Sequence, residues 1–96
     1  MPYIRQIERT VLDPMIDEIS KHAEHDGQLN YIITRLCHNW IIKVGKKYTR
    51  INQIIGVLHC VSMEFYRRVA APYEDTKIKE NGCISDVDRS AVSDYS

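Results

Sequence analysis

The sequence has little of several residue types that mark particular protein classes. Its 96 residues include three cysteines, three prolines and four glycines, and 13 Lys+Arg balance 13 Asp+Glu. Cys37, Cys60 and Cys83 are odd in number and far apart, without CxxC or CxH spacing, which excludes a disulfide framework and a zinc knuckle. The low proline and glycine content excludes a collagen-like chain, and the zero net charge argues against bulk DNA or RNA as a partner.

Long hydrophobic runs are also lacking. The longest apolar run covers residues 54–58, far short of the ~20 residues that span a bilayer. Glu8 and Arg9 stand where a signal peptide would need its apolar region. We therefore expect a cytoplasmic protein without a membrane partner.

Apolar residues recur instead at helical spacing. An N-terminal arm over residues 1–10 is expected, and then Asp13-Pro14 predicts a helix start with Asp13 as N-cap and Pro14 in the first turn. This short helix, or the loop after it, should end at Gly27. A second helix is predicted from Leu29 to Val44, with Gly45 at its C-terminal end.

A third helix is predicted from an N-cap at Thr49 to Ala70 or Ala71, where Pro72 should stop it. It carries one apolar stripe from Ile51 to Val69 and a second, rotated stripe that includes Val57, Cys60 and Met63. A helix that is apolar on more than one face needs more than one partner. We therefore expect a homo-oligomer, a dimer or a tetramer, with this helix near its centre and with Cys37 and Cys60 as small core residues.

The chain becomes polar after Pro72. Residues 73–79 suit another helical turn, and Asn81-Gly82 is a turn signal. The expected architecture is all-α: a compact bundle of about three helices, one short and two long, with an N-terminal arm. It forms a single domain over residues 1–82, followed by a mobile tail over residues 83–96.

The residues that could support catalysis or bind a metal form no recognisable motif. His22 and His25 lie three apart without a third ligand of firm spacing, so solvent-exposed histidines explain them. His38 and His59 each follow or precede a cysteine, but sequence neighbours on a helix point in different directions. No phosphate-binding loop, nucleophile elbow or zinc-protease motif is present. We expect no enzyme activity, no cofactor and no metal.

The segment from Glu64 to Lys77 is the best candidate for a ligand site. Phosphate oxygens suit the paired donors of arginine, and a tyrosine ring can stack on a base. The candidate residues are Tyr66 for stacking, Arg67 and Arg68 for phosphate, Tyr73 and Lys77 as closing groups, and Tyr3 and Arg5 of the arm as lesser candidates. On composition alone, a solvated helix end with arginines paired to Glu64 or Glu74 explains the same residues more simply.

Several segments resemble a small, widespread phage and bacterial family that is described as a domain of unknown function. The resemblance spans roughly residues 1–82 and is carried by Met1–Ile4, Gly27–Thr34, Gly56–Leu58, Glu64–Asp75 and Lys77–Gly82. The family usually has an acidic residue and a quick stop after Asn-Gly, whereas Cys83 and a longer tail follow here.

By size, phage context and breadth of distribution, the chain resembles the viral anti-CBASS sponges. These proteins capture cyclic nucleotide signals of bacterial immunity. The resemblance implies that the chain sequesters a ligand such as 3′,3′-cyclic GMP-AMP, without cleaving it, in the cytoplasm of an infected host. The alternative is a small helical phage oligomer that binds and modulates a host or viral protein. A nuclease or phosphodiesterase is a third possibility, but it lacks a metal cluster or an acid/base pair.

Overall fold

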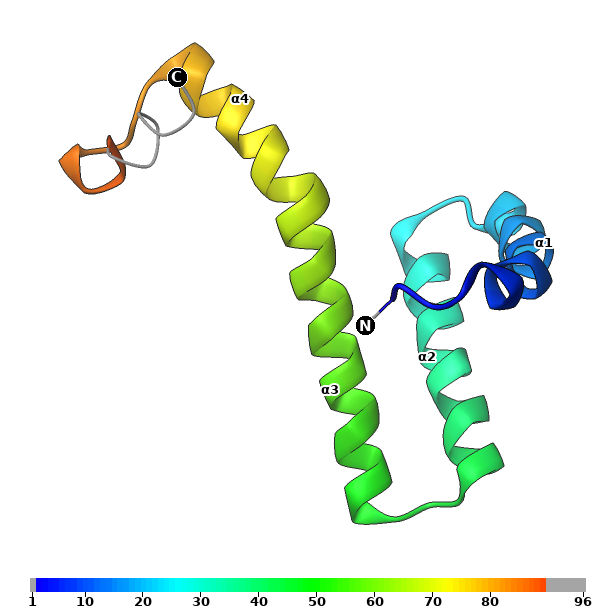
Figure 1. Cartoon of the computed structure of the whole chain (residues 1–96). Coiled ribbons are helices and arrows are strands. Elements are labelled where there is room, and N and C mark those ends of the chain that lie inside the picture. The colour runs from blue at the N-terminus through cyan, green and yellow to red at the C-terminus, as the bar shows by residue number, and fades with distance from the viewer. Residues whose placement is uncertain (1, 90–96) are drawn as a thin grey trace. The chain divides into compact units, whose positions relative to one another are not determined.

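The computed structural model describes residues 2–89, and within that range the chain is helical without a strand. Three long helical stretches follow one another: α1 (Gln6–His22), α2 (Asp26–Val44) and a stretch made of α3 (Tyr48–Phe65), the π-helical η1 (Tyr66–Ala70) and α4 (Ala71–Asn81) (Figure 1). A short 3-10 turn, η2 (Asp86–Asp88), ends the described part. The all-α prediction is confirmed. The expected short first helix is wrong, because α1 has 17 residues against 19 in α2.

The chain divides into two units, Met1–Leu58 and His59–Ser96, with the boundary inside α3. Each unit is described by itself below. The single domain over residues 1–82 stays a prediction. The predicted mobile tail lies partly outside the described residues, and its first part holds the η2 turn.

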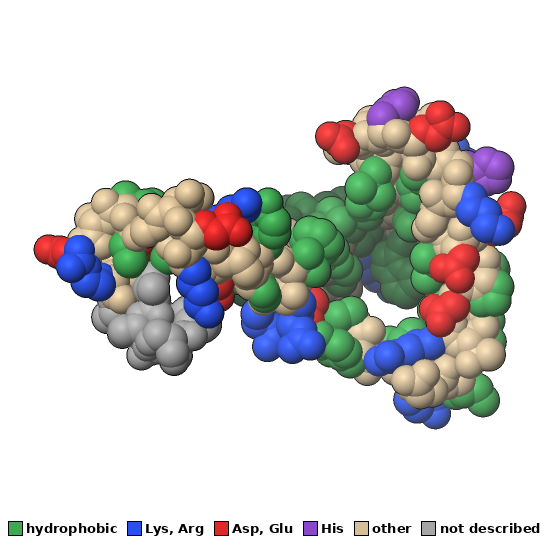
Figure 2. Space-filling model, turned by 90° about the horizontal axis from the view of Figure 1, so that it is seen from above, with side chains coloured by type: hydrophobic (Ala, Val, Ile, Leu, Met, Phe, Trp, Pro, Cys, Tyr) green, Lys and Arg blue, Asp and Glu red, His purple; other side chains and the backbone are tan. Residues whose placement is uncertain are grey.

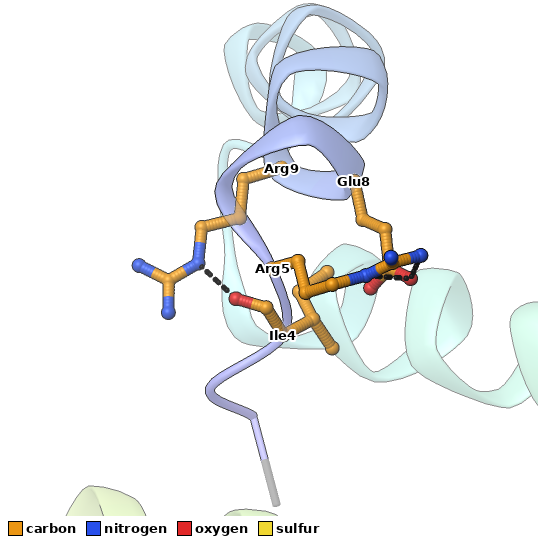
Figure 3. Close-up of polar contacts among 4 residues, drawn as sticks. All are labelled: Ile4, Arg5, Glu8 and Arg9. Atoms are coloured by element: carbon orange, nitrogen blue, oxygen red, sulfur yellow. Dashed lines mark hydrogen bonds and ion pairs between the residues drawn. The ribbon is translucent and has the colours of Figure 1, made fainter.

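The predicted start of the first helix is wrong. α1 begins at Gln6 and carries Pro14 in its interior, so the arm is only residues 2–5 and Asp13 is no N-cap. The first turn is held by side chains: Arg5 contacts the Glu8 carboxylate at 3.0 Å, and Arg9 Nε donates to the Ile4 carbonyl at 2.9 Å (Figure 3). These contacts, with backbone bonds from Glu8 and Arg9 to the Arg5 carbonyl, let the helix begin before the proline.

Capping residues at the two ends of α2 determine where the loops before and after it begin and end. α1 ends at His22 rather than at Gly27, which lies inside α2, and His25 is the N-cap of α2. The prediction that Gly45 lies at the C-terminal end of α2 is confirmed, and its φ of 99° is one that favours glycine. The Arg50 guanidinium donates to the Val44 and Gly45 carbonyls and so ties the loop to α3, which begins at Tyr48 rather than after a Thr49 cap.

Pro72 does not stop the third helix, contrary to the prediction. A proline in a helix lacks an N–H and its ring clashes with the carbonyl four residues earlier. The helix accommodates this clash by widening one turn, in which the Ala71 N–H bonds the Tyr66 carbonyl five residues back. α4 then continues to Asn81 and ends at Gly82, whose φ is 89°. The turn predicted at Asn81-Gly82 is confirmed.

No helix of either unit covers another. Among residues 2–89 no side chain is buried, and no two helices that a loop separates lie in close backbone contact. Figure 2 shows apolar side chains in full view beside charged ones. Taken by itself, neither unit forms a buried core from its described residues, and the predicted compact bundle stays a prediction. Cys37 is half-buried, and Cys60 is exposed rather than in a core.

Candidate ligand-binding site

The wide turn before Pro72 lies at the centre of the candidate segment and decides which of its side chains share a face. Successive residues of an α-helix are rotated by about 100°, so positions eight apart differ by about 80°. A wide turn holds one extra residue, so two residues that are eight apart across it point in directions that differ by only about 20°, as residues seven apart do in an ordinary α-helix. Tyr66 and Glu74 are such a pair, and the Tyr66 hydroxyl lies 3.4 Å from the Glu74 carboxylate.

Tyr73 and Lys77 form a second pair on α4. The Lys77 ammonium lies 5.5 Å from the centre of the Tyr73 ring, a cation–π distance, and 3.3 Å from the Glu80 carboxylate. By the same rotation, the wide turn aligns Tyr73 with Phe65. The expected closing groups therefore come together, on a face next to that of Tyr66.

The two arginines lie on other faces. Arg67 makes an ion pair of 3.2 Å with the half-buried Glu64, and its helical position aligns it with Asp75, not with Tyr73. Arg68 is exposed, and within residues 2–89 no ion pair is seen for it. One chain thus groups Tyr66, Tyr73 and Lys77 but does not gather both arginines into a single pocket with them.

The electrostatics of the segment are balanced. Between residues 64 and 80, four cationic side chains face four carboxylates: Arg67, Arg68, Lys77 and Lys79 against Glu64, Glu74, Asp75 and Glu80. An anion can bind at Arg68 directly, or at Arg67 or Lys77 after it displaces Glu64 or Glu80. The exposed Lys77–Glu80 pair is worth only about 0–1 kcal/mol, so its exchange is cheap.

The remaining candidates, Tyr3 and Arg5, belong to the first unit. Tyr3 is 61% exposed, and the Arg5 guanidinium is bonded to Glu8 (Figure 3). Without a ligand, Arg5 therefore stabilises the start of α1. To bind a ligand, Arg5 would have to release Glu8, as Arg67 would have to release Glu64.

A pocket that the sequence did not indicate lies between the end of α1 and the start of α2. It measures about 360 Å³ and is lined by Ile19, His22, His25, Gly27, Gln28, Tyr31 and Ile32. His25 Nδ1 accepts from the Gln28 N–H at 3.3 Å, while Gln28 Oε1 accepts from the Glu24 N–H at 2.7 Å. His25 thus caps the start of α2, and Gln28 reaches back to the residue before the cap, a variation on the capping box.

The histidines of this pocket have structural partners. His22 Nε2 lies 3.5 Å from the Glu18 carboxylate, and His25 is engaged in the cap. Across residues 2–89 there is no group of three His, Cys, Asp or Glu side chains that could hold a metal ion. In the same range no helix is long and apolar enough to cross a membrane.

Comparison with known proteins places the chain by its family alone. No curated protein and no solved structure matches it. A family defined as a domain of unknown function, DUF6899, matches residues 1–84, which include every candidate site residue. The match covers most of the 96 residues, and the chain therefore belongs to the DUF6899 family.

Proposed function

We propose that the chain is a binding protein that works as a homo-oligomer and sequesters a cyclic nucleotide signal, such as 3′,3′-cyclic GMP-AMP, without cleaving it. The observation that carries the proposal is the absence of any buried side chain among residues 2–89. Folding depends on burying apolar surface, and units that bury so little by themselves need a partner surface to cover their apolar faces. Copies of the same chain are the most economical partner.

The ligand class is supported by the side chains around the wide turn. Tyr66 and Tyr73 are 55% and 62% exposed, which leaves their rings available for stacking on bases. Arg68 offers a guanidinium, and Arg67 offers a second one after exchange of Glu64 for a phosphate. Sequestration needs tight binding and slow release but no acid/base pair.

Symmetry explains how arginines from different faces could serve one ligand. A cyclic dinucleotide is nearly two-fold symmetric, and a two-fold interface presents the same residues twice. Tyr66 and Arg68 from two copies would then each meet an equivalent half of the ligand. A phosphate enclosed between copies needs its charge matched, which the arginines supply.

Isothermal calorimetry with a panel of cyclic di- and trinucleotides tests the ligand. We expect micromolar or tighter binding of at least one member, and intact ligand recovered by mass spectrometry after denaturation. Tyr66→Ala should weaken binding at least tenfold, since it removes the ring. Tyr66→Phe is the matched control, because it keeps the ring and loses only the hydrogen bond to Glu74. Absence of binding by every nucleotide at 100 µM would refute the proposal.

A second candidate is a protein-interaction module, which the exposed apolar side chains favour. Trp40 and Met63 are 53% and 68% exposed, and aromatic residues and methionine are enriched at protein interfaces. This function predicts a stoichiometric complex with a host or viral protein, together with indifference to nucleotides. Pull-down with purified candidate proteins, followed by calorimetry, separates the two functions.

A further inference from the structure

The second unit carries a row of apolar side chains on one face. Val61, Phe65, Val69 and Tyr73 follow one another at steps of four residues and are 51–63% exposed. Lys77 is the next member, with its ammonium over the Tyr73 ring. We call the row Val61, Phe65, Val69, Tyr73 and Lys77 the seam.

The wide turn keeps the seam on one face. In an uninterrupted α-helix each step of four residues drifts by about 40°, which would carry Lys77 about 160° away from Val61. The π-helical segment Tyr66–Ala70 takes up one extra residue and removes about 100° of this drift. The same effect occurs in coiled coils, where inserted residues reset the register of an apolar row. Pro72 causes the wide turn and so sets the register of the seam.

We propose that the seam is a docking surface for the equivalent helix of a second copy of this chain, and that Pro72 is the positioning residue that makes it continuous. Within the second unit, the described residues hold no helix that packs on this face; only the consecutive η1 and α4 are in contact. The inference rests on the homo-oligomer of the proposed function but not on its nucleotide ligand.

The extent of the seam argues for a copy of the chain rather than a small peripheral partner. Its four apolar members are 51–63% exposed and recur over about three helical turns of the second unit. A second copy carries an identical row of the same length, so two such helices can cover each other along the whole seam.

The charge pattern is compatible with self-association. Residues 59–81 contain equal numbers of cationic and anionic side chains, so two copies of the helix do not repel one another in net charge. A two-fold contact brings the same face of both copies together, so an apolar row meets an apolar row. A partner of strong net charge would find no matching field on this helix.

Sedimentation velocity on the full chain between 1 and 100 µM tests the proposal. We expect the wild type to associate. Phe65→Ala and Tyr73→Ala should each raise the dissociation constant at least tenfold. Lys79→Ala is the control, because Lys79 is exposed about 200° around the helix from Lys77 and should change the constant less than twofold.

Pro72→Ala distinguishes the effect of the helical register on association from the effect of the apolar side chains themselves. It retains every seam side chain but allows the wide turn to become an ordinary α-turn, which rotates residues 73–81 relative to Phe65. We expect the helical circular dichroism to be kept or to rise while the dissociation constant increases at least tenfold. This variant also decides the matter if Phe65→Ala does not fold.

A wild type that stays monomeric at 100 µM would overturn the proposal, even if it binds a nucleotide. If Pro72→Ala associates as strongly as the wild type, the role of Pro72 in setting the register of the seam would be refuted. Association without nucleotide binding would instead support the seam and refute the ligand, so the two failures are distinguishable.

Discussion

The two units contain the same three local features and differ in how the helix accommodates its proline. Each has a proline inside a helical stretch, a glycine with positive φ at a helix end, and a side-chain cap: Pro14, Gly45 and His25 in the first, Pro72, Gly82 and Ser85 in the second. Around Pro14 the helix stays α-helical, whereas before Pro72 it widens to a π-turn. The residue type therefore indicates a local problem but does not dictate its solution.

The largest expected difference concerns the prolines. Pro14→Ala should raise the free energy of unfolding by up to about 3 kcal/mol, because α1 carries the missing hydrogen bond without a wide turn. Pro72→Ala should bring no such gain, since the π-turn already relieves the clash. Urea denaturation of both variants at one protein concentration measures the difference. Equal gains would show that the wide turn relieves nothing.

The glycine pair should give the next largest effect. Both Gly45→Ala and Gly82→Ala place a side chain at positive φ, at a cost of about 1 kcal/mol. At Gly45 the added Cβ would also lie 2.6 Å from the Arg50 guanidinium, whereas at Gly82 it meets nothing within 4 Å. Gly45→Ala should therefore be the more destabilising by thermal denaturation. Because Arg50→Ala alone also removes the hydrogen bonds to the Val44 and Gly45 carbonyls, the clash is measured as the difference between Gly45→Ala in the wild type and Gly45→Ala added to Arg50→Ala, which should cost only the backbone term.

Substitutions of the two capping residues should have the next largest effect on stability. His25→Ala removes the acceptor of the Gln28 N–H and should cost about 1 kcal/mol, while His25→Asn keeps an acceptor and should cost less. Hydrogen exchange at the start of α2 reports the loss directly. Ser85→Ala should affect only the three-residue η2, because that cap closes a single turn. A global loss of stability in Ser85→Ala would contradict this ranking.

The smallest expected effect is a dependence on pH in the second unit. Hydrogen bonds from the Ser85 and Ile84 N–H groups lower the pKa of Asp88 below its ordinary value of 3.8. A lowered carboxyl pKa stabilises the fold above the ordinary value, and the stabilisation is lost as the pH falls from 3.8 through the lowered pKa. NMR shifts of Ile84 and Ser85 between pH 5 and 2 should report this loss, and Asp88→Asn should abolish the change.

Predictions from the sequence succeeded where one residue type has one strong conformational preference. Gly45 and Gly82 end helices at positive φ, and the apolar spacing of α2 and α3 made both helices recognisable. They failed at both prolines. Pro14 predicts a helix start, but contacts of Arg5 and Arg9 begin α1 earlier, and Pro72 predicts a helix end where α4 continues to Asn81.

The candidate site was only partly predictable for the same reason. The sequence indicated Tyr66, Arg67, Arg68, Tyr73 and Lys77 as neighbours along the chain, but their faces depend on the wide turn, and Pro72 alone does not distinguish a widened turn from a helix end. The histidine cap at His25 could have been found from Gln28 three residues later. The pocket beside it could not, because its lining comes from two helices.

By itself, the sequence determined that this protein is helical, that its helices end at Gly45 and Gly82, and that α3 is apolar on more than one face. These properties follow from backbone preferences and from the period of the α-helix, which act over a few residues. Only the structure decided that, within each unit, the described helices leave apolar side chains exposed and that the helix widens a turn before Pro72 rather than ending there. Both outcomes depend on how neighbouring turns and distant helices share space and hydrogen bonds, which no local preference specifies.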